Sequence, residues 1–368
     1  MIVHLFNDEK FVNSTIENFE GVVKNKNRYI ILTNNTLLKY VSPHKKIEKM
    51  KTSNLNLDCI YKNCNLLIIH FLTSTKLYIL KYKPRHTKVL WSVWGSDAYN
   101  HFSHQDFYES HTKEILKKSV YQSIRFSKIY TLYHLLRYKV RPIREEKINL
   151  KKIDFISTVI PYEFEIITKE FDLQVEQIDY NYSVNEFKNI SLPTLGNAVL
   201  IGNSATLTNN HLDVFEIIRN LNKKIIVPLN YGAIGYKDYK KNIITNGKNK
   251  FKNNFNAIES FLNKDEYDKI LKSCNTMIMY HIRQQGLGNI YMALYLGIRL
   301  FLNKKSVTYK YLKDIGMIVF DLQKDTELVG IELNNKQKEN NKILVIKMFG
   351  SKAIKNKINK IIKLHDSL

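Results

Sequence analysis

Short apolar runs alternate with helix-like patterns along most of this 368-residue chain, and this alternation limits the fold more than any other feature. The runs are rich in Ile, Leu and Val, and the segments between them have the apolar spacing of amphipathic helices. This order is typical of parallel α/β sheets, because parallel strands need a long crossover connection. We expect strands at Ile2–Phe6, Tyr29–Leu32, Leu66–His70, Val89–Trp94, Phe155–Val159, Val199–Ile201, Lys224–Pro228, Thr276–Tyr280, Arg299–Leu302 and Met317–Phe320. We expect helices at Ser14–Val23, Phe107–Lys117, Asn209–Asn220, Asp265–Ser273 and Ile290–Leu296.

The chain is longer than the size at which single hydrophobic cores usually split, so two domains are expected. The strand and helix pattern restarts near residue 197, and the polar stretch Tyr180–Gly196 is the expected linker. We therefore predict an α/β protein with two doubly wound, Rossmann-like domains that face a central cleft. Residues 1–190 form the first domain, 191–345 the second, and 346–368 a C-terminal helix that crosses back to the first domain or lies on a membrane.

Composition and termini exclude several classes of protein. The three cysteines, Cys59, Cys64 and Cys274, form no CxxC pattern, so neither a disulfide framework nor a zinc site is expected, and a reducing compartment fits best. Acidic residues near the N-terminus interrupt any signal peptide, and no apolar run reaches the roughly 18 residues that span a bilayer. The sequence predicts a soluble or peripheral protein.

The charge is strongly basic, with 57 Lys and Arg against 34 Asp and Glu and a net charge of +23. Nucleic acid, an anionic membrane or phosphorylated substrates would each suit such an excess. The alternative is that an AT-biased coding sequence enriches Lys, Asn and Ile, and that much of the lysine is only solvated surface. Zinc-finger spacing, an RRM signature and glycine–arginine tracts are all missing from the sequence, so a membrane surface is favoured over nucleic acid.

The segment from Tyr280 to Leu296 has the strongest functional signal, and it follows the strand-like run Thr276–Tyr280. A strand-like run leads into Arg283-Gln-Gln-Gly-Leu-Gly288, and the apolar spacing of a buried helix begins at Asn289. A helix that begins after such a turn presents unpaired N–H groups to an anion, and glycine lets a phosphate approach the backbone. Arg283 supplies a planar fork of donors for diphosphate oxygens. A plain connection remains the alternative.

Two other strand ends of the second domain carry polar or aromatic side chains. Gly202-Asn203-Ser204 follows the first strand, and its donors suit phosphate or ribose, although an N-capping loop is as good an interpretation. Tyr231 follows the next strand, where it could stack on a base or sugar ring or simply pack. Both segments are expected at the carboxyl edge of the sheet, where such folds bind ligands.

In the first domain, Trp91-Ser-Val-Trp94-Gly-Ser96-Asp97 combines aromatic rings with a carboxylate at a strand end. Aromatic rings and an acid suit sugar recognition and a general base, whereas a buried Trp and a capping Asp are the alternative. His70 ends a neighbouring strand, and His4 lies in the first strand. A core histidine is the favoured interpretation for His4 and one of two for His70.

These motifs, in this order, resemble the TDP-N-acetylfucosamine:lipid II N-acetylfucosaminyltransferase family and its relatives in O-antigen and capsule synthesis. The resemblance rests on Trp91–Asp97, Leu200–Ser204 followed by Asn210-His211, Val227–Tyr231 and, above all, Arg283–Gly288. It extends from about Leu66 to Phe320. Asn289 and the Ala-Thr-Leu-Thr stretch after Ser204 depart from the family pattern and leave the donor sugar open.

The resemblance implies a metal-independent GT-B glycosyltransferase that moves a 4-acetamido-4,6-dideoxyhexose from a dTDP-sugar to an undecaprenyl-diphosphate-linked saccharide. It implies a peripheral protein on the cytoplasmic face of the bacterial membrane, with the first domain binding the acceptor at Trp94 and Ser96 and the second binding the donor. Asp97 is the first candidate for the catalytic base and His70 the second. The implied donor-binding residues are Gly202, Asn203, Ser204, Tyr231, Arg283, Gln284, Gln285, Gly286, Gly288 and Asn289.

The residues agree with a reaction that needs no cofactor or metal. The sequence contains no Asp-x-Asp, the paired carboxylates that a divalent ion on a nucleotide sugar would use. Two other classes stay open: a non-catalytic nucleotide-sugar-binding protein and a basic nucleic-acid-binding protein.

Overall fold

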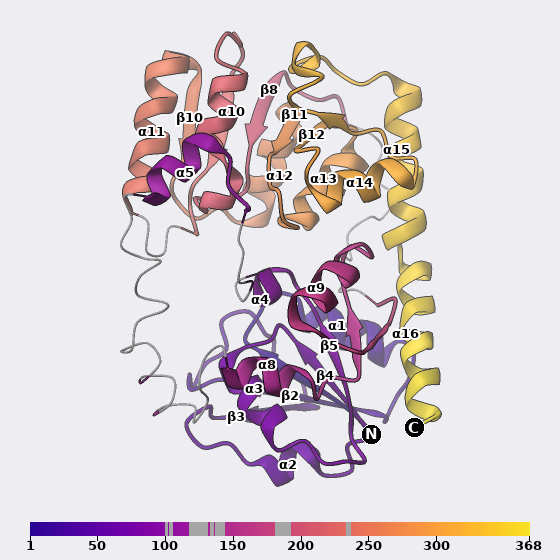
Figure 1. The fold of residues 1–368 in the computed structure, drawn as a ribbon. Coiled ribbons are helices and arrows are strands. Elements are labelled where there is room, and N and C mark those ends of the chain that lie inside the picture. Colours follow the sequence, from indigo (N-terminus) through magenta and orange to yellow (C-terminus); the bar gives the residue numbers. More distant parts are fainter. Residues whose placement is uncertain are drawn as a thin grey trace. The chain divides into compact units, whose positions relative to one another are not determined.

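The protein consists of two compact α/β units, described from a computed structural model (Figure 1). Unit 1 contains Met1–Ser103, Ser123–Asn185 and Phe349–Leu368, and unit 2 contains His104–Gln122 and Glu186–Met348. The structure describes residues 1–99, 102, 106–117, 132, 136, 144–180, 193–232 and 237–368. Each unit has its own parallel sheet, so the predicted fold class of two doubly wound α/β sheets is confirmed.

Unit 1 is built on a seven-stranded sheet in the order β3-β2-β1-β4-β5-β6-β7, with every neighbouring pair parallel. The central strands are runs of buried Ile, Leu and Val, as expected for strands covered on both faces. The strands are β1 (Ile2–Asn7), β2 (Asn27–Leu32), β3 (Ile47–Met50), β4 (Leu66–His70), β5 (Lys88–Ser92), β6 (Phe155–Ser157) and β7 (Glu176–Gln177). The helices are α1 (Val12–Glu20), α2 (Leu57–Tyr61), α3 (Ser74–Lys81), α4 (Ser96–Tyr99), α8 (Arg144–Leu150), α9 (Glu163–Phe171) and α16 (Ser351–Asp366).

Unit 2 is built on a six-stranded parallel sheet in the order β10-β9-β8-β11-β12-β13. The strand order therefore runs outward in both directions from β8 and β11, the first and fourth strands of this unit. The strands are β8 (Ala198–Ile201), β9 (Ile225–Pro228), β10 (Phe255–Ile258), β11 (Cys274–Met279), β12 (Arg299–Leu302) and β13 (Phe320–Asp321). The helices are α5 (Ser110–Lys117), α10 (His211–Ile217), α11 (Lys237–Phe251), α12 (Lys264–Lys272), α13 (Leu287–Leu296), α14 (Val307–Asp314) and α15 (Asn335–Phe349).

Helix α5 precedes most of unit 2 in the sequence but belongs to that unit. The Asp213 carboxylate accepts hydrogen bonds from the backbone N–H groups of His111 (2.8 Å) and Thr112 (3.2 Å), at the start of α5. The Glu109 carboxylate accepts from Lys305 Nζ at 2.9 Å, just beyond the end of β12. These contacts fix α5 against α10 and against the carboxyl edge of the unit 2 sheet.

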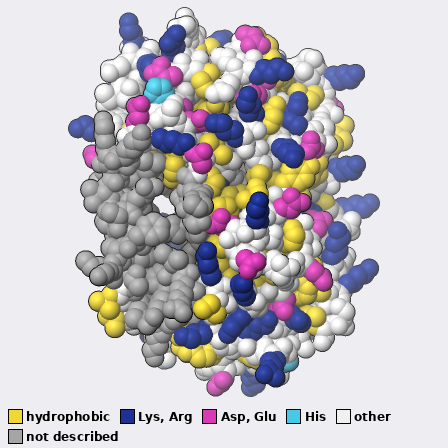
Figure 2. Space-filling view, viewed as in Figure 1, with side chains coloured by type: hydrophobic (Ala, Val, Ile, Leu, Met, Phe, Trp, Pro, Cys, Tyr) yellow, Lys and Arg dark blue, Asp and Glu magenta, His cyan; other side chains and the backbone are white. Residues whose placement is uncertain are grey.

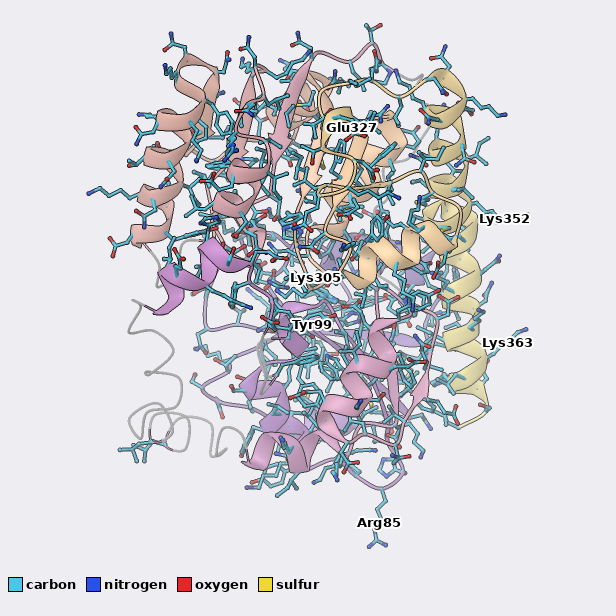
Figure 3. The ribbon with its side chains drawn as sticks, turned by 45° about the horizontal axis from the view of Figure 1, so that its top comes forward. Arg85, Tyr99, Lys305, Glu327, Lys352 and Lys363 are labelled. Atoms are coloured by element: carbon cyan, nitrogen blue, oxygen red, sulfur yellow. The ribbon has the colours of Figure 1, made fainter. Side chains whose placement is uncertain are left out.

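Helix α16 returns the end of the chain to unit 1. Its apolar stripe, Ile354, Ile358 and Ile361, is buried in the unit 1 core together with side chains of β1, β2 and β4. Lys357 and Lys360 pair with Asp179 at 3.0 and 3.1 Å. The lysines of the outer face, such as Lys352 and Lys363 in Figure 3, point away from the helix. The apolar stripe is thus buried within unit 1, and an additional position of this helix on a membrane stays a prediction.

Most predicted strands appear within two residues of their expected ends, and Leu66–His70 and Arg299–Leu302 match. The sequence missed β3, β7 and β10, which are the outermost strands of their sheets and carry polar side chains. Most of the predicted linker, Tyr180–Gly196, lies outside the described residues. Gly196, at its end, donates its backbone N–H to Lys272 O at 2.9 Å.

Positive charge is spread over the described part of the face seen in Figure 2. In the view of Figure 2, dark-blue Lys and Arg side chains are scattered among acidic ones and do not form one continuous stripe. This distribution does not favour a dedicated nucleic-acid groove on that face. None of the helices in the described ranges is long and apolar enough to cross a membrane.

Shortening an isoleucine on the apolar stripe of α16 tests its structural role. Ile358 has no exposed surface, so Ile358→Ala should destabilise the protein by about 2–5 kcal/mol through lost burial and a cavity. Thermal unfolding measures the loss, and Lys352→Ala, on the exposed face, is the control that should change little. Equal melting temperatures for Ile358→Ala and the wild type would contradict the packing described above.

Candidate functional site

The carboxyl edge of the unit 2 sheet has a topological switch point between β8 and β11. These strands are parallel neighbours, with Ile201 paired to Ile278, so both end at the same edge. β9 lies on the other side of β8 and β12 on the other side of β11. Crossovers therefore leave the switch point in opposite directions, and in open α/β sheets ligands bind in this position.

Gly202 makes the turn that follows β8. Its φ is +68°, and its N–H donates to Ile278 O at 2.9 Å. A Cβ at this position would lie 2.6 Å from Asn209 Oδ1 and 2.7 Å from His211 Nε2. Both the backbone angle and the lack of space require glycine, and the turn directs Asn203 to the switch point.

A web of side-chain hydrogen bonds joins the turns after β8, β9 and β11. Gln285 Nε2 donates to Asn203 Oδ1 and to Thr206 Oγ1, both at 3.0 Å. Asn203 Nδ2 donates to the Tyr231 hydroxyl at 3.2 Å, and Thr208 Oγ1 donates to Gln285 Oε1. Three predicted donor-binding residues, Asn203, Tyr231 and Gln285, are therefore brought together.

Asn209 and His281 form a buried support beneath this web. Asn209 Oδ1 lies 3.0 Å from the Asn203 N–H and 2.7 Å from His281 Nε2. Burial, and then the charge of Arg283, holds the pKa of His281 well below its usual value, so the ring is neutral and its Nε2–H donates to the amide oxygen. Asn209 Nδ2 donates to Ser204 O at 2.9 Å. The prediction treated Asn209 only as a helix start and did not include His281.

The turn after β11 leads into α13 through Gly286. Gly286 has φ +64°, and a Cβ there would lie 2.7 Å from Met279 Cε and 3.2 Å from Asn203 Nδ2. The first turn of α13 contains no acidic side chain, and its leading N–H groups have no carbonyl one turn earlier in the helix. Beside it, Gln284 is 2% exposed, and its buried Oε1 has no hydrogen-bond partner.

The other predicted donor residues differ in exposure. Arg283 is half-buried, and its Nη1 donates to Gln284 O at 3.0 Å. Gly288 and Asn289 are half-buried in the first turn of α13. Ser204 is 1% exposed, and its hydroxyl lies 3.0 Å from Thr206 Oγ1, so it supports the web from inside. Tyr231, three residues beyond the end of β9, is 54% exposed as a residue.

In unit 1, His70 lies in a buried cluster of rings. Its Nε2 lies 3.2 Å from His4 Nδ1, and its ring stacks on Phe6 with centroids 4.0 Å apart. Burial, and then His4 and Lys76, keeps the pKa of His70 well below its usual value. The ring is therefore neutral. Of the two predicted roles of His70, a buried core histidine and a catalytic base, this position favours the first. The same holds for His4.

Asp97, the predicted general base, has an arrangement typical of a capping carboxylate. It is 2% exposed, and it accepts hydrogen bonds from the N–H groups of Leu72, Trp94 and the Trp91 indole, each at 2.9 Å. Burial raises its pKa, and these bonds oppose the shift. The geometry favours the capping alternative, and the role of base stays a prediction.

The predicted acceptor residues Trp94 and Ser96 are half-buried beside this carboxylate. The Trp94 ring meets Phe11 edge-on, with centroids 5.3 Å apart. Trp94, in the loop after β5, thus contacts the segment after β1. Its role in acceptor binding stays a prediction.

Two ionisable residues of unit 1 were not predicted. Lys76, on α3, is fully buried, and its Nζ donates to His70 O and to Phe71 O, at 2.9 Å for the latter. Burial lowers its pKa to about 7, opposed by Asp97 and then Glu9. Glu9 follows β1 and is half-buried; burial raises its pKa, and Lys76 opposes the shift. The sequence gave no signal for this electrostatic interaction, because Lys76 and Glu9 lie far apart in the chain.

Within the described residues, no group of three or more His, Cys, Asp and Glu side chains is placed to hold a metal ion. The turns at the carboxyl edge of the unit 2 sheet instead present amide, hydroxyl and backbone donors. Such donors suit an uncharged sugar or an anionic diphosphate.

Comparison with protein families agrees with this geometry. Residues 177–352 match the family described as "4-alpha-L-fucosyltransferase glycosyl transferase group 56". The matched stretch contains β8, β9, β11 and α13, and so all ten of the predicted donor-binding residues.

Solved structures with the same fold include several glycosyltransferases. A glycosyltransferase from Rickettsia africae has a TM-score of 0.62 at 13% identity, over 100% of this chain and 97% of that one. Anabaena HepE, in complex with UDP and glucose, has a TM-score of 0.64 at 9% identity, over 99% of each chain. The UDP-forming α,α-trehalose-phosphate synthase of Burkholderia xenovorans has a TM-score of 0.63 at 6% identity, over 100% of both. At these identities the likeness establishes the GT-B fold alone.

The two glycines of the α13 turn should respond differently to alanine. At Gly286 the positive φ and the short contacts predict a loss of about 1–2 kcal/mol in stability. A Cβ at Gly288 meets nothing within 4 Å, so Gly288→Ala should keep the wild-type melting temperature. If Gly288→Ala is as stable as the wild type but binds the nucleotide more weakly, the added methyl group hinders the approach of the ligand to the backbone. Melting curves of both variants test this contrast, which an unstable Gly288→Ala protein would contradict.

Proposed function

We propose that this chain, a glycosyltransferase of group 56 with the GT-B fold, transfers a 4-acetamido-4,6-dideoxyhexose from a dTDP-sugar to a lipid-linked saccharide. The observation that carries the proposal is the web joining Asn203, Tyr231 and Gln285 beside the Gly286 turn, inside the segment that matches the family. The acceptor is an undecaprenyl-diphosphate-linked saccharide of surface polysaccharide synthesis, such as O-antigen, capsule or common antigen.

The donor diphosphate binds at the switch point of unit 2. The leading N–H groups of α13 and the Arg283 guanidinium face a negative charge there, and they stabilise the diphosphate as it leaves. Oriented donors of this kind act without a metal ion. Gly286 and Gly288 keep the approach free of side chains.

The exposed Tyr231 ring offers a flat apolar surface for the thymine base or the sugar ring of the donor. Its hydroxyl accepts from Asn203, which in turn accepts from Gln285. The ring orientation is therefore fixed by the same web that shapes the phosphate turn, so base and diphosphate recognition depend on each other.

In the transfer itself, the acceptor oxygen bonds to the anomeric carbon, the bond from that carbon to the diphosphate breaks, and dTDP leaves. The hydroxyl proton passes to a base of the acceptor unit. We assign this role to Glu9, a half-buried carboxyl directly beyond β1, because the lone pairs of Asp97 already accept three N–H groups.

The lipid-linked acceptor and the net charge of +23 support work at an anionic membrane surface, on its cytoplasmic face. The enzyme would be bound there peripherally.

Removing the guanidinium tests the donor site. Arg283→Ala should weaken dTDP binding by about 1.5–3 kcal/mol, the scale of a charge-assisted hydrogen bond. Calorimetry with dTDP, UDP and GDP measures the loss and shows whether the wild type prefers dTDP. Arg85→Ala, an arginine of unit 1 that points away from the protein in Figure 3, is the control. Unchanged dTDP affinity in Arg283→Ala would remove this residue from the site.

Carboxamide variants of Glu9 and Asp97 test which of these two carboxylates acts as the base. Glu9→Gln should lower turnover by on the order of 10²–10⁴ at an unchanged melting temperature. Because burial raises the pKa of Glu9, the wild-type rate should rise with pH as this carboxyl ionises, and Glu9→Gln should lose that acid limb. Asp97→Asn should lower stability by about 1–3 kcal/mol, because an amide hydrogen then faces N–H donors.

The measurement is sugar transfer to a lipid-linked acceptor, alongside thermal unfolding of each variant. A stable but inactive Asp97→Asn protein beside an active Glu9→Gln protein would return the role of base to Asp97. His70→Ala is the third variant, because His70 was the other predicted base.

A further inference from the structure

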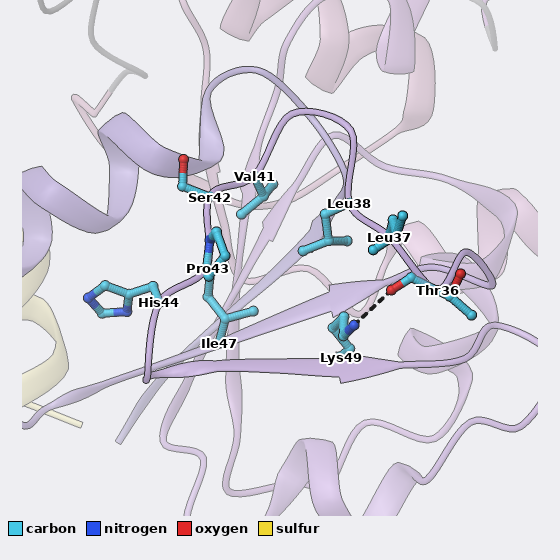
Figure 4. Close-up of a pocket in the computed structure, with 9 residues that line it drawn as sticks. All are labelled: Thr36, Leu37, Leu38, Val41, Ser42, Pro43, His44, Ile47 and Lys49. Atoms are coloured by element: carbon cyan, nitrogen blue, oxygen red, sulfur yellow. Dashed lines mark hydrogen bonds between the residues drawn. The ribbon is translucent and has the colours of Figure 1, made fainter.

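Unit 1 contains an apolar pocket that the functions above do not use. It lies between β3 and the loop that joins β2 to β3, and its volume is about 340 Å³ (Figure 4). This volume is in the range of small-ligand sites. The apolar side chains that line it are Leu37, Leu38, Val41, Pro43 and Ile47.

Some residues that line this apolar pocket are part of the unit 1 core, whereas Leu37 is exposed to solvent. Val41 is 6% exposed and belongs to the unit 1 core, against which Leu38 and Ile47 pack. Leu37, by contrast, is 84% exposed. A leucine with so much exposed surface adds little to folding, and it gains stabilisation only when a ligand covers it.

The loop that surrounds the pocket is basic. The segment from Thr33 to Lys46 contains three lysines and no acidic residue. Lys46 pairs with Glu20, whereas Lys39 and the nearby Lys10 lie beside the residues that line the pocket. Two lysines lie over the Tyr40 ring, Lys39 with its Nζ at 5.0 Å and Lys10 at 5.8 Å from the ring centre. An apolar pocket with lysines at its rim is complementary to an apolar chain that ends in an anionic group.

The rim is tied to the end of β1. The Asp8 carboxylate accepts a hydrogen bond from the Tyr40 N–H at 3.0 Å and another from the Lys39 N–H. Asp8 precedes Glu9, the residue to which we assign the acceptor proton. The basic rim therefore lies at the same strand end as the proposed base.

We propose that this pocket binds the diphosphate-proximal isoprenyl units of the acceptor lipid, with the diphosphate beside Lys10 and Lys39. The proposal rests on the lipid-linked acceptor of the proposed function and adds the place where its chain is recognised. The saccharide beyond the diphosphate then extends toward Glu9. An isoprenyl diphosphate meets both halves of the site, since the branched apolar chain fills the pocket and the anion meets the lysines.

The test compares two water-soluble acceptors that carry the same diphosphate saccharide on either a methyl or a geranyl group. Leu37→Ser should raise KM for the geranyl acceptor about tenfold, equivalent to ~1.4 kcal/mol, and leave KM for the methyl acceptor and for the donor unchanged. Ile148→Ser, at a 56% exposed isoleucine on α8, is the matched control and should change neither. Equal KM values in the wild type and Leu37→Ser for the geranyl acceptor would overturn the proposal.

Calorimetry with geranyl diphosphate gives a readout that does not depend on turnover. The wild type should bind geranyl diphosphate, and Leu37→Ser should bind it about tenfold more weakly. The affinity of Lys39→Gln should depend less on salt concentration than that of the wild type. A wild type that transfers sugar but does not bind geranyl diphosphate would overturn the pocket and leave the proposed function intact. A wild type that binds geranyl diphosphate but transfers no sugar would contradict the proposed function and support the pocket.

Discussion

The constraint on which the rest of the structure depends is that neighbouring parallel strands end at the same edge of their sheet. In unit 2 this brings the segments after β8 and β11 together, although about 80 residues separate them, and Gln285 can then donate to Asn203. The contact is possible only because Gly202 and Gly286 adopt positive φ angles and leave no side chain between the two turns. A ligand site made of amides, hydroxyls and a helix start is thus a consequence of strand order and two glycines.

The carboxyl edge of the unit 1 sheet differs from that of unit 2 in the burial of its polar groups. There the strand-end groups are largely buried: Asp97 holds the turn after β5 to the loop after β4, and Lys76 holds the end of β4 through His70 O and Phe71 O. Burying a lysine and a carboxylate is costly unless hydrogen bonds compensate. Here Lys76 donates to two carbonyl oxygens, and Asp97 accepts from three N–H groups. The result is a rigid edge that leaves Glu9 as a half-exposed carboxyl, beside a loop that combines apolar and basic side chains.

The sequence predicted the fold and the glycine turn that leads into α13 well, because both follow from local patterns. Buried strands such as Leu66–His70 are continuous apolar runs, and Arg283–Gly288 is a recognisable turn. The edge strand Ile47–Met50, Ile-Glu-Lys-Met, has no such run, since an edge strand is half-exposed. The partners of Asp97 could not be predicted, because Leu72 is 25 residues away in sequence and its N–H points to Asp97 only once β4 and β5 pair. The burial of Lys76 has the same long-range origin.

A crystal structure of the protein with dTDP would show whether the donor diphosphate binds where the turns after β8 and β11 meet. We expect phosphate oxygens within hydrogen-bonding distance of the backbone at Gly286–Gly288 and of the Arg283 guanidinium, with Tyr231 against the nucleoside. A dTDP molecule bound away from the carboxyl edge of the unit 2 sheet would contradict it.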